Sequence, residues 1–165
     1  MDLSAVSMVV SVAALSVAVV AMVKKNEKKE SAGAGFDSMP LRLQAYERLV
    51  LLTERIALPN LIARLSQPGI AAAEMKLILV EHIKQEFEYN STQQLYVSQI
   101  AWDALRNLKE QNIMIIHQVA ATLPPTASGA DLNKKILELL MSQPNASPHE
   151  MVAQALNFEA KKMML

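Results

Sequence analysis

The hydrophobic and polar positions of this chain follow two different patterns. Residues 3–23 contain no charged residue, proline or glycine, whereas apolar residues recur every three or four positions from residue 41 onward. The first pattern is typical of a helix that spans a membrane, and the second of amphipathic helices that share a core. No stretch of alternating residues predicts a strand. We therefore expect an all-α fold, with one N-terminal transmembrane helix over residues 1–23 followed by an elongated bundle of about five helices.

The uncharged stretch has the length that a bilayer requires. As a helix its 21 residues extend about 31 Å, close to a hydrocarbon thickness of about 30 Å. A cleaved signal peptide is one alternative, because Ala32-Gly33-Ala34 resembles a cleavage site. However, Asp2 is the only charged side chain before the stretch, and lysines separate it from that site. Two further alternatives are a buried helix of a soluble protein, which would show a polar stripe, and an interfacial helix, which would show a charged face.

Four lysines follow the uncharged stretch directly, and none precedes it. By the positive-inside rule, this asymmetry places the amino terminus outside and residues 24–165 in the cytoplasm. The same lysines would contact anionic lipid head groups, at about 1 kcal/mol each. Residues 24–38 are charged and then rich in Gly and Ala, so we interpret them as a linker. The lysines at the membrane interface are Lys24, Lys25, Lys28 and Lys29.

Small side chains recur along the predicted span at alternating spacings of three and four residues. Such a seam lets a second helix approach closely, although a span rich in Val, Ala and Ser also contains this pattern by chance. We expect the span to associate with a copy of itself or with another membrane protein, in addition to the lipid bilayer. The seam consists of Ser4, Ser7, Ser11, Ala14, Ala18 and Ala21.

Prolines, glycines and capping residues divide the rest of the chain into helices. Ser38 can cap a first helix that Pro59 ends, and Ser128 can cap the fifth. The fourth helix would extend about 48 Å if it ran unbroken through residues 92–123, which favours an elongated antiparallel bundle. The sequence Ser147-Pro148-His149-Glu150 is a capping box that predicts a sixth helix. The remaining predicted helices cover residues 60–66, 70–89 and 130–142. We assign residues 39–123 to the core of the helical domain and residues 124–165 to a C-terminal pair of helices.

Composition excludes several classes of protein and site. The chain has no cysteine, which rules out a disulfide scaffold and a thiolate metal site. Its 16 basic and 16 acidic residues balance, which argues against a nucleic-acid binder. We find no phosphate loop, nucleophile elbow or Glu-x-x-His di-iron pattern; His82 and Glu86 share a helix face, but we interpret them as ordinary polar residues. We therefore expect no enzyme activity, no metal and no cofactor.

Two groups of side chains in the helical region could belong either to the packing of the domain or to a surface. Glu81, Glu86 and Glu88 form an acidic cluster, which we interpret as a solvated face. The alternative is that one of these carboxylates pairs with an arginine of the first helix and fixes the helix register. Tyr89, Tyr96 and Trp102 lie near one turn of the chain, and we favour the core over a binding surface for them. The arginines available for pairing are Arg42, Arg48 and Arg55.

Two stretches together carry a family resemblance. One is residues 41–49, with the sequence LRLQAYERL, followed by Glu54-Arg55-Ile56; the other is residues 86–90, EFEYN, leading into 93–98 and Trp102. They resemble an uncharacterised family of small membrane-anchored helical proteins of Bacteroidota, over roughly residues 1–123. The resemblance implies a single N-terminal span, a Lys-rich linker and a helical domain. It implies no activity, cofactor or catalytic residue, and this span is unusually rich in Ala and Ser.

These observations predict a structural role. We expect an accessory or scaffold subunit of an inner-membrane assembly, which acts by holding a cytoplasmic interaction domain at the membrane and forms a homo-oligomer or joins a larger complex. The alternative is a membrane-tethered helical enzyme, or a regulator that binds a metal or a soluble ligand. The candidate residues for a partner surface or for helix register are Arg42, Gln44, Tyr46, Glu47, Arg48, Glu54, Arg55, Glu86, Glu88, Tyr89, Gln93, Gln94, Tyr96 and Trp102.

Overall fold

A computed structural model describes residues 37–142 and 148–164 of the chain. The chain divides into two units, Met1–Ser38 and Met39–Leu165. The predicted transmembrane helix, its seam of small residues and the four lysines after it lie outside the described residues. Within the described residues, no helix combines the length and apolar character that a membrane span needs.

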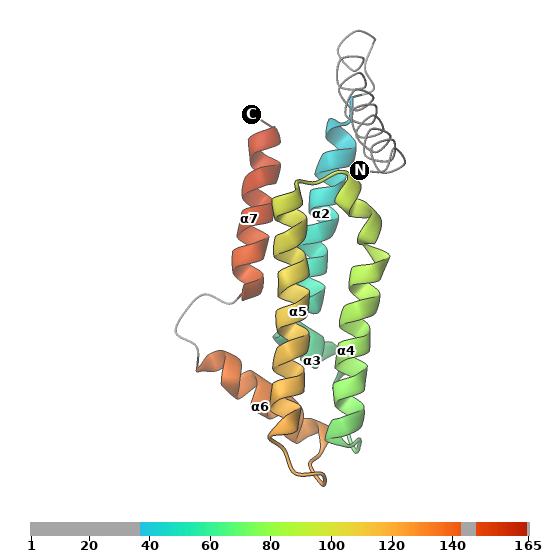
Figure 1. The fold of residues 1–165 in the computed structure, drawn as a ribbon, viewed down its shortest axis with the longest axis vertical. Helices are drawn as coiled ribbons and strands as arrows, with labels where there is room; N and C mark the ends of the chain where they lie inside the picture. Colours follow the sequence, from blue (N-terminus) through green and yellow to red (C-terminus); the bar gives the residue numbers. More distant parts are fainter. Residues whose placement is uncertain (1–36, 143–147, 165) are drawn as a thin grey trace, which may run out of the picture. The chain divides into compact units, whose positions relative to one another are not determined.

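The described part of Met39–Leu165 is all-α, which confirms the predicted fold class for this region. Figure 1 shows α2, α4, α5 and α7 running alongside one another, with α2 antiparallel to both α4 and α7. The short α3 and the oblique α6 lie toward the end at which α4 begins. The elements are α2 (Met39–Ile56), α3 (Leu58–Leu65), α4 (Ala72–Tyr89), the 3-10 helix η1 (Ser91–Leu95), α5 (Gln99–Ala121), α6 (Gly129–Met141) and α7 (Pro148–Met163).

The buried face of α2 follows the predicted apolar stripe. Ala45, Leu49, Leu52 and Ile56 are at most 1 % exposed, and their spacing of three or four residues keeps them on one side of the helix. This face packs against α4, α5 and α7, so α2 contacts every other long helix of the domain. The polar Thr53 is also buried there, because its hydroxyl donates back to the Leu49 carbonyl of the same helix at 2.8 Å.

A proline and a hydrogen bond from α5 define the junction between α2 and α3. As predicted, Pro59 stops the first helix and stands in the opening turn of the short one that follows. The Ile56 carbonyl at the end of α2 accepts a hydrogen bond from the buried Asn112 side chain of α5 at 2.8 Å. This bond supplies a partner for a backbone oxygen that the helix end would otherwise leave unsatisfied.

The prediction of one long helix over residues 92–123 is wrong. The chain forms η1 after α4, leaves the helical path, and starts α5 only at Gln99. Ser98 produces this break: its hydroxyl accepts from the Ala101 amide at 3.0 Å, and its own amide donates to the Tyr46 hydroxyl at 3.1 Å. The 23 residues of α5 extend about 35 Å, so the expected length of 48 Å does not occur.

The start of α6 confirms the predicted cap at Ser128. Its hydroxyl and Asp131 form a reciprocal capping box, with the Asp131 amide donating to the Ser128 oxygen at 3.2 Å. Gly129 follows the cap and lies against the start of α4, where a Cβ atom would come within 3.0 Å of Ile70 and Met75 side-chain carbons. The close approach of these two segments therefore favours glycine at this position.

The two C-terminal helices pack at different places on the domain. α6 contacts α3, α4 and α5, whereas α7 contacts α2 and α5. α7 begins at Pro148 as the capping sequence predicted, although Ser147 lies outside the described residues. Both helices thus complete the same domain as residues 39–123, each by covering a different part of its core.

Candidate functional site

An open groove runs between α2 and α4 and has a volume of about 590 Å³. Each helix contributes four side chains at positions i, i+3, i+4 and i+7, the spacing that places residues on one helix face. This geometry explains why a continuous groove forms along two antiparallel helices. The residues of the α2/α4 groove are Arg48, Leu51, Leu52 and Arg55 from α2, and His82, Gln85, Glu86, Tyr89 and the C-cap Asn90 from α4.

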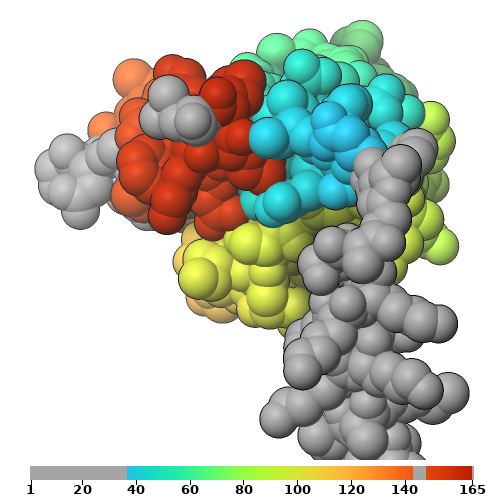
Figure 2. All heavy atoms as spheres, turned by 90° about the horizontal axis from the view of Figure 1, so that it is seen from above, coloured from blue at the N-terminus to red at the C-terminus, as the bar shows by residue number. Residues whose placement is uncertain are grey.

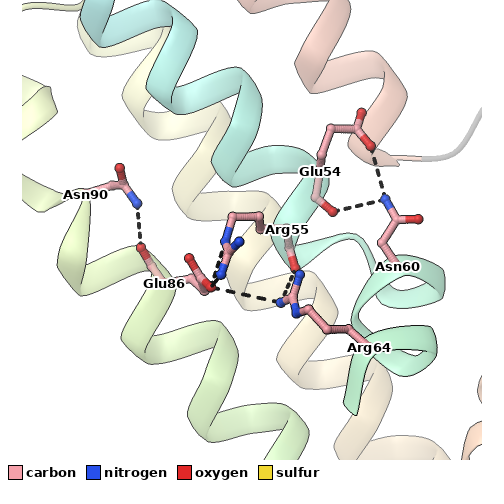
Figure 3. A network of polar contacts seen from close by, with 6 residues as sticks. All are labelled: Glu54, Arg55, Asn60, Arg64, Glu86 and Asn90. Atoms are coloured by element: carbon pink, nitrogen blue, oxygen red, sulfur yellow. Dashed lines mark hydrogen bonds and ion pairs between the residues drawn. The ribbon is translucent and has the colours of Figure 1, made fainter. Parts of the chain in front are cut away.

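An ion pair between Arg55 and Glu86 bridges the groove (Figure 3). The Arg55 Nε atom donates to Glu86 Oε1 at 2.8 Å, and its Nη2 atom contacts the same oxygen. Arg64 of α3 places its Nη2 atom 4.0 Å from that oxygen and donates to the Arg55 carbonyl at 3.1 Å. One carboxylate therefore connects three helices, and the pairing that sequence analysis held as an alternative is confirmed for these two residues.

The surroundings favour the charged form of Glu86. The hydrogen bond from Arg55 lowers the pKa of the Glu86 carboxyl and outweighs partial burial, which acts in the opposite direction. The same bond raises the pKa of Arg55. Glu86 stands in the last turn of α4, which has no basic residue of its own, so its charge opposes the helix dipole. Arg55 supplies from α2 the positive charge that the last turn of α4 lacks.

The groove combines cationic and apolar side chains. Leu52 is buried at its base, whereas Leu51 and Tyr89 are 59 % and 77 % exposed at its rim. Arg48 has no ion-pair partner within the described residues, while the charge of Glu86 is already matched by Arg55. The arrangement can therefore hold an apolar side chain beside a carboxylate that belongs to a bound molecule.

A second polar cluster joins α2, α5 and α7, which we call the Tyr46 joint. Glu159 Oε2 accepts hydrogen bonds from the Tyr46 hydroxyl at 2.6 Å and from the Ser98 hydroxyl at 2.7 Å. Burial, followed by the bond to Glu159, raises the pKa of Tyr46. Both bonds end on one carboxyl oxygen of Glu159, which has the two lone pairs needed to accept them. The joint sets the register of α7 against the other two helices.

The structure separates the predicted surface residues into three groups. Arg48, Arg55, Glu86 and Tyr89 meet in the α2/α4 groove. Tyr46 and Trp102 are buried at 2 % and 5 % exposure, with the Trp102 ring centroid 4.9 Å from that of Phe87. The remaining candidates lie outside the lining of the groove; they are Arg42, Gln44, Glu47, Glu54, Glu88, Gln93, Gln94 and Tyr96.

The prediction of core positions for the aromatic residues holds in part. Trp102 is buried as expected, but Tyr89 and Tyr96 are 77 % and 38 % exposed, so the prediction is wrong for both tyrosines. Tyr89 is the last residue of α4 and Tyr96 the C-cap of η1, so both lie at helix ends. The break in the chain before α5, which the predicted long helix lacked, also accounts for the exposure of Tyr89 and Tyr96.

Sequence reasoning missed several residues that the structure brings to these sites. Leu51, Leu52 and Gln85 line the groove, and their helical spacing from Arg48, Arg55 and Glu86 was the available signal. No local pattern points to Glu159, because its partners lie 113 and 61 residues earlier in the chain. Among the residues that the structure describes, no cluster of three or more His, Cys, Asp or Glu side chains could hold a metal ion.

Comparison with known proteins identifies a family without a known activity. A family model described as a family of unknown function, DUF7935, matches residues 2–163. No curated protein matches the chain. No solved structure matches it either.

Proposed function

Since the chain belongs to DUF7935, a family of unknown function, we propose a role from its own residues. The protein is a single-pass accessory or scaffold subunit of an inner-membrane assembly, with its helical domain in the cytoplasm. The uncharged residues 3–23 and the four lysines after them support the anchor and its orientation. A linker of residues 24–38 keeps the domain near the bilayer, which raises its effective concentration for a membrane-bound partner.

The α2/α4 groove is the observation that carries the interaction role. It presents Arg48, which has no ion-pair partner in the described part of the chain, next to the exposed Leu51 and Tyr89. The Arg55–Glu86 pair holds the two helices of the groove in register. Exposed aromatic and arginine side chains dominate the binding energy of many interfaces. We therefore assign the groove to a partner segment that carries an acidic residue beside an apolar one.

Anchoring is tested by extraction of the full chain from bacterial membranes with alkaline carbonate. We expect the protein to stay in the membrane pellet, because a span of this length is released only by detergent. A variant in which Ala14 and Leu15 are both replaced by Arg should leave the pellet, since charges at the middle of a span cost several kcal/mol. Release of the unchanged protein by carbonate would contradict the anchor.

Docking in the groove is tested by purifying the full chain in nanodiscs and identifying the proteins that remain bound. The double variant Arg48→Glu and Tyr89→Ser should retain at least about tenfold less partner, because it reverses the free charge and removes the exposed ring. The matched control is Arg106→Glu on α5, which lies outside the groove and should leave binding unchanged. If both variants retained the same amount of bound partner, the groove would not be the docking site.

The size of the groove favours a second candidate function, a regulator that binds a small anionic ligand. A volume of about 590 Å³ lies within the range of small-molecule sites, and Arg48, His82 and Tyr89 could recognise a carboxylate attached to an apolar body. Thermal unfolding in the presence of a library of organic acids separates the two candidates. A rise in Tm that Arg48→Glu abolishes would favour the regulator, whereas capture of a protein through the same residues would favour the scaffold.

A further inference from the structure

One end of the helical domain gathers exposed apolar side chains. Tyr89 ends α4, Leu95 and Tyr96 end η1, and Ile100 lies in the first turn of α5. Phe158 lies in the second half of α7, and Met164 directly follows that helix. These are six of the twelve exposed large apolar side chains among the described residues, with exposed fractions from 38 % to 77 %. Soluble surfaces scatter such residues singly, so this concentration on α4, η1, α5 and α7 needs an explanation.

The same end is where α2 begins. Figure 1 shows the start of α2, the start of α5 and the end of α7 at one end of the bundle, and Figure 2 looks onto that end. The Tyr46 joint fixes this arrangement, because Tyr46 of α2, the Ser98 cap of α5 and Glu159 of α7 share one hydrogen-bonded cluster. The end therefore lies next to Met39, the residue at which the linker that follows the predicted span enters the domain.

We propose that this end of the domain lies on the lipid bilayer, with Leu95, Tyr96, Ile100, Phe158 and Met164 in the interfacial layer and Tyr89 at its edge, where it lines the groove. The inference rests on the proposed membrane anchor and adds the orientation of the domain on the membrane. Aromatic and long aliphatic side chains favour the zone between head groups and acyl chains. Lys161 and Lys162, in the last turn of α7, have no ion-pair partner within the described residues and can contact anionic head groups.

The charges near this end are compatible with a lipid surface. The Glu159 carboxylate accepts two hydrogen bonds inside the Tyr46 joint, so it faces the domain. Asp37, just before α2, and Glu88 of α4 are exposed carboxylates near this end, and Arg42 of α2 adds a positive charge to those of the two lysines. Held in this way, the domain turns the long sides of α2 and α4, with the groove between them, toward a neighbouring membrane protein.

The test uses full-length protein in nanodiscs, with one fluorophore on one introduced cysteine. The absence of native cysteine makes each label unique. Leu95→Cys and Phe158→Cys place the label at the proposed contact, at positions 75 % and 70 % exposed. Leu77→Cys is the matched control, because Leu77 is 64 % exposed and lies near the opposite end of α4. Brominated acyl chains should quench the first two labels about threefold more strongly than the control.

Two results would overturn the orientation. Equal quenching at positions 95 and 77 would show that the domain does not lie on this end. A label at Leu95 that is shielded from an aqueous quencher but insensitive to brominated lipid would show that protein, such as a second copy of the chain, covers the end. A chain that fails to enter nanodiscs at all would instead contradict the membrane anchor, so the two failures are distinguishable.

The lysines provide an independent measurement on the same preparation. Replacing Lys161 and Lys162 with Gln should lower the quenching at Leu95→Cys by about half in anionic lipid and leave it unchanged in neutral lipid. The matched control replaces Lys134 and Lys135, an adjacent pair on α6, and should have no effect in either lipid. Equal effects of the two pairs would contradict a head-group contact by α7.

Discussion

Asn112 shows how a single polar side chain fixes the meeting of distant helices. It is 5 % exposed on α5, and its amide group donates to the Ile56 carbonyl at the end of α2, 56 residues earlier in the chain. Apolar packing alone tolerates sliding of one helix along another. A directed hydrogen bond at a helix end does not, because the buried carbonyl then loses its partner.

The change Asn112→Ala should therefore lower the free energy of unfolding by about 2 kcal/mol, the typical result of leaving a buried acceptor unsatisfied. Urea unfolding of the full chain in detergent, followed by circular dichroism, measures the change. The control is Asn107→Ala on the same helix, an exposed position at which we expect a change below about 0.5 kcal/mol. Equal losses at the two positions would contradict a specific role for the bond.

The Arg55–Glu86 pair predicts how stability depends on pH. The folded-state pKa of Glu86 is lowered, so its contribution is complete at neutral pH and disappears as the pH falls through that lowered value. Because Arg55 is 44 % exposed, we expect Glu86→Gln to cost only about 0.5 to 1 kcal/mol at neutral pH. The difference from the unchanged protein should vanish in acid, in a series of urea titrations from pH 7 to pH 3.

The neighbouring Glu88 provides the control for that series. It lies in the same last turn of α4 and is exposed. Its charge opposes the helix dipole, so Glu88→Gln should be neutral or slightly stabilising at neutral pH. If Glu88→Gln lowered the free energy of unfolding as much as Glu86→Gln does, the loss of a negative charge in this turn, and not the pair with Arg55, would determine the change.

At the scale of elements, the Tyr46 joint determines how α7 attaches to the domain. Tyr46→Phe keeps the buried ring but removes the hydroxyl that donates to Glu159 and accepts from the Ser98 amide. We expect a loss of about 1 to 2 kcal/mol and faster hydrogen exchange of the α7 amides, with α4 exchange changed less. Uniform acceleration in all helices would show that α7 has no local opening of its own.

Alkaline unfolding offers a second readout of the same joint. The pKa of Tyr46 is raised in the folded protein, so the contribution of its neutral hydroxyl is complete below the ordinary tyrosine pKa. It is lost as the pH rises through the raised value. The unchanged protein should therefore lose stability above about pH 10, and Tyr46→Phe should lose less over the same interval. Parallel losses in both proteins would assign the alkaline effect to other groups.

The elements also show which information the sequence contains. The bounds of α2 and the cap of α6 were predictable, because Pro59 and the Ser128–Asp131 box act within a few residues. The start of α5 was not predicted, because Ser98 is one of several possible local caps and its amide is bound by Tyr46 of a distant helix. The Arg55–Glu86 pair was accessible as one of several possible pairings, and only the packing of α2 on α4 selected it.

At the scale of the whole molecule, the seam of small residues in the predicted span concerns association in the membrane. Replacing Ala14 and Ala18 with Leu should weaken self-association several-fold in a bacterial two-hybrid assay, because larger side chains keep two helices apart. The control replaces Val9 and Val20 with Leu, on the opposite face of the same predicted helix. Equal signals from both variants would contradict pairing through this seam.

The bond between Tyr46 and Glu159 also has a consequence for biosynthesis. The two residues lie 113 positions apart, and a ribosome makes α2 long before it reaches α7. During that interval the side of α2 that α7 finally covers is exposed on the nascent chain. A chaperone or protease that recognises this side therefore has its main access before translation of α7, and docking of α7 ends that period.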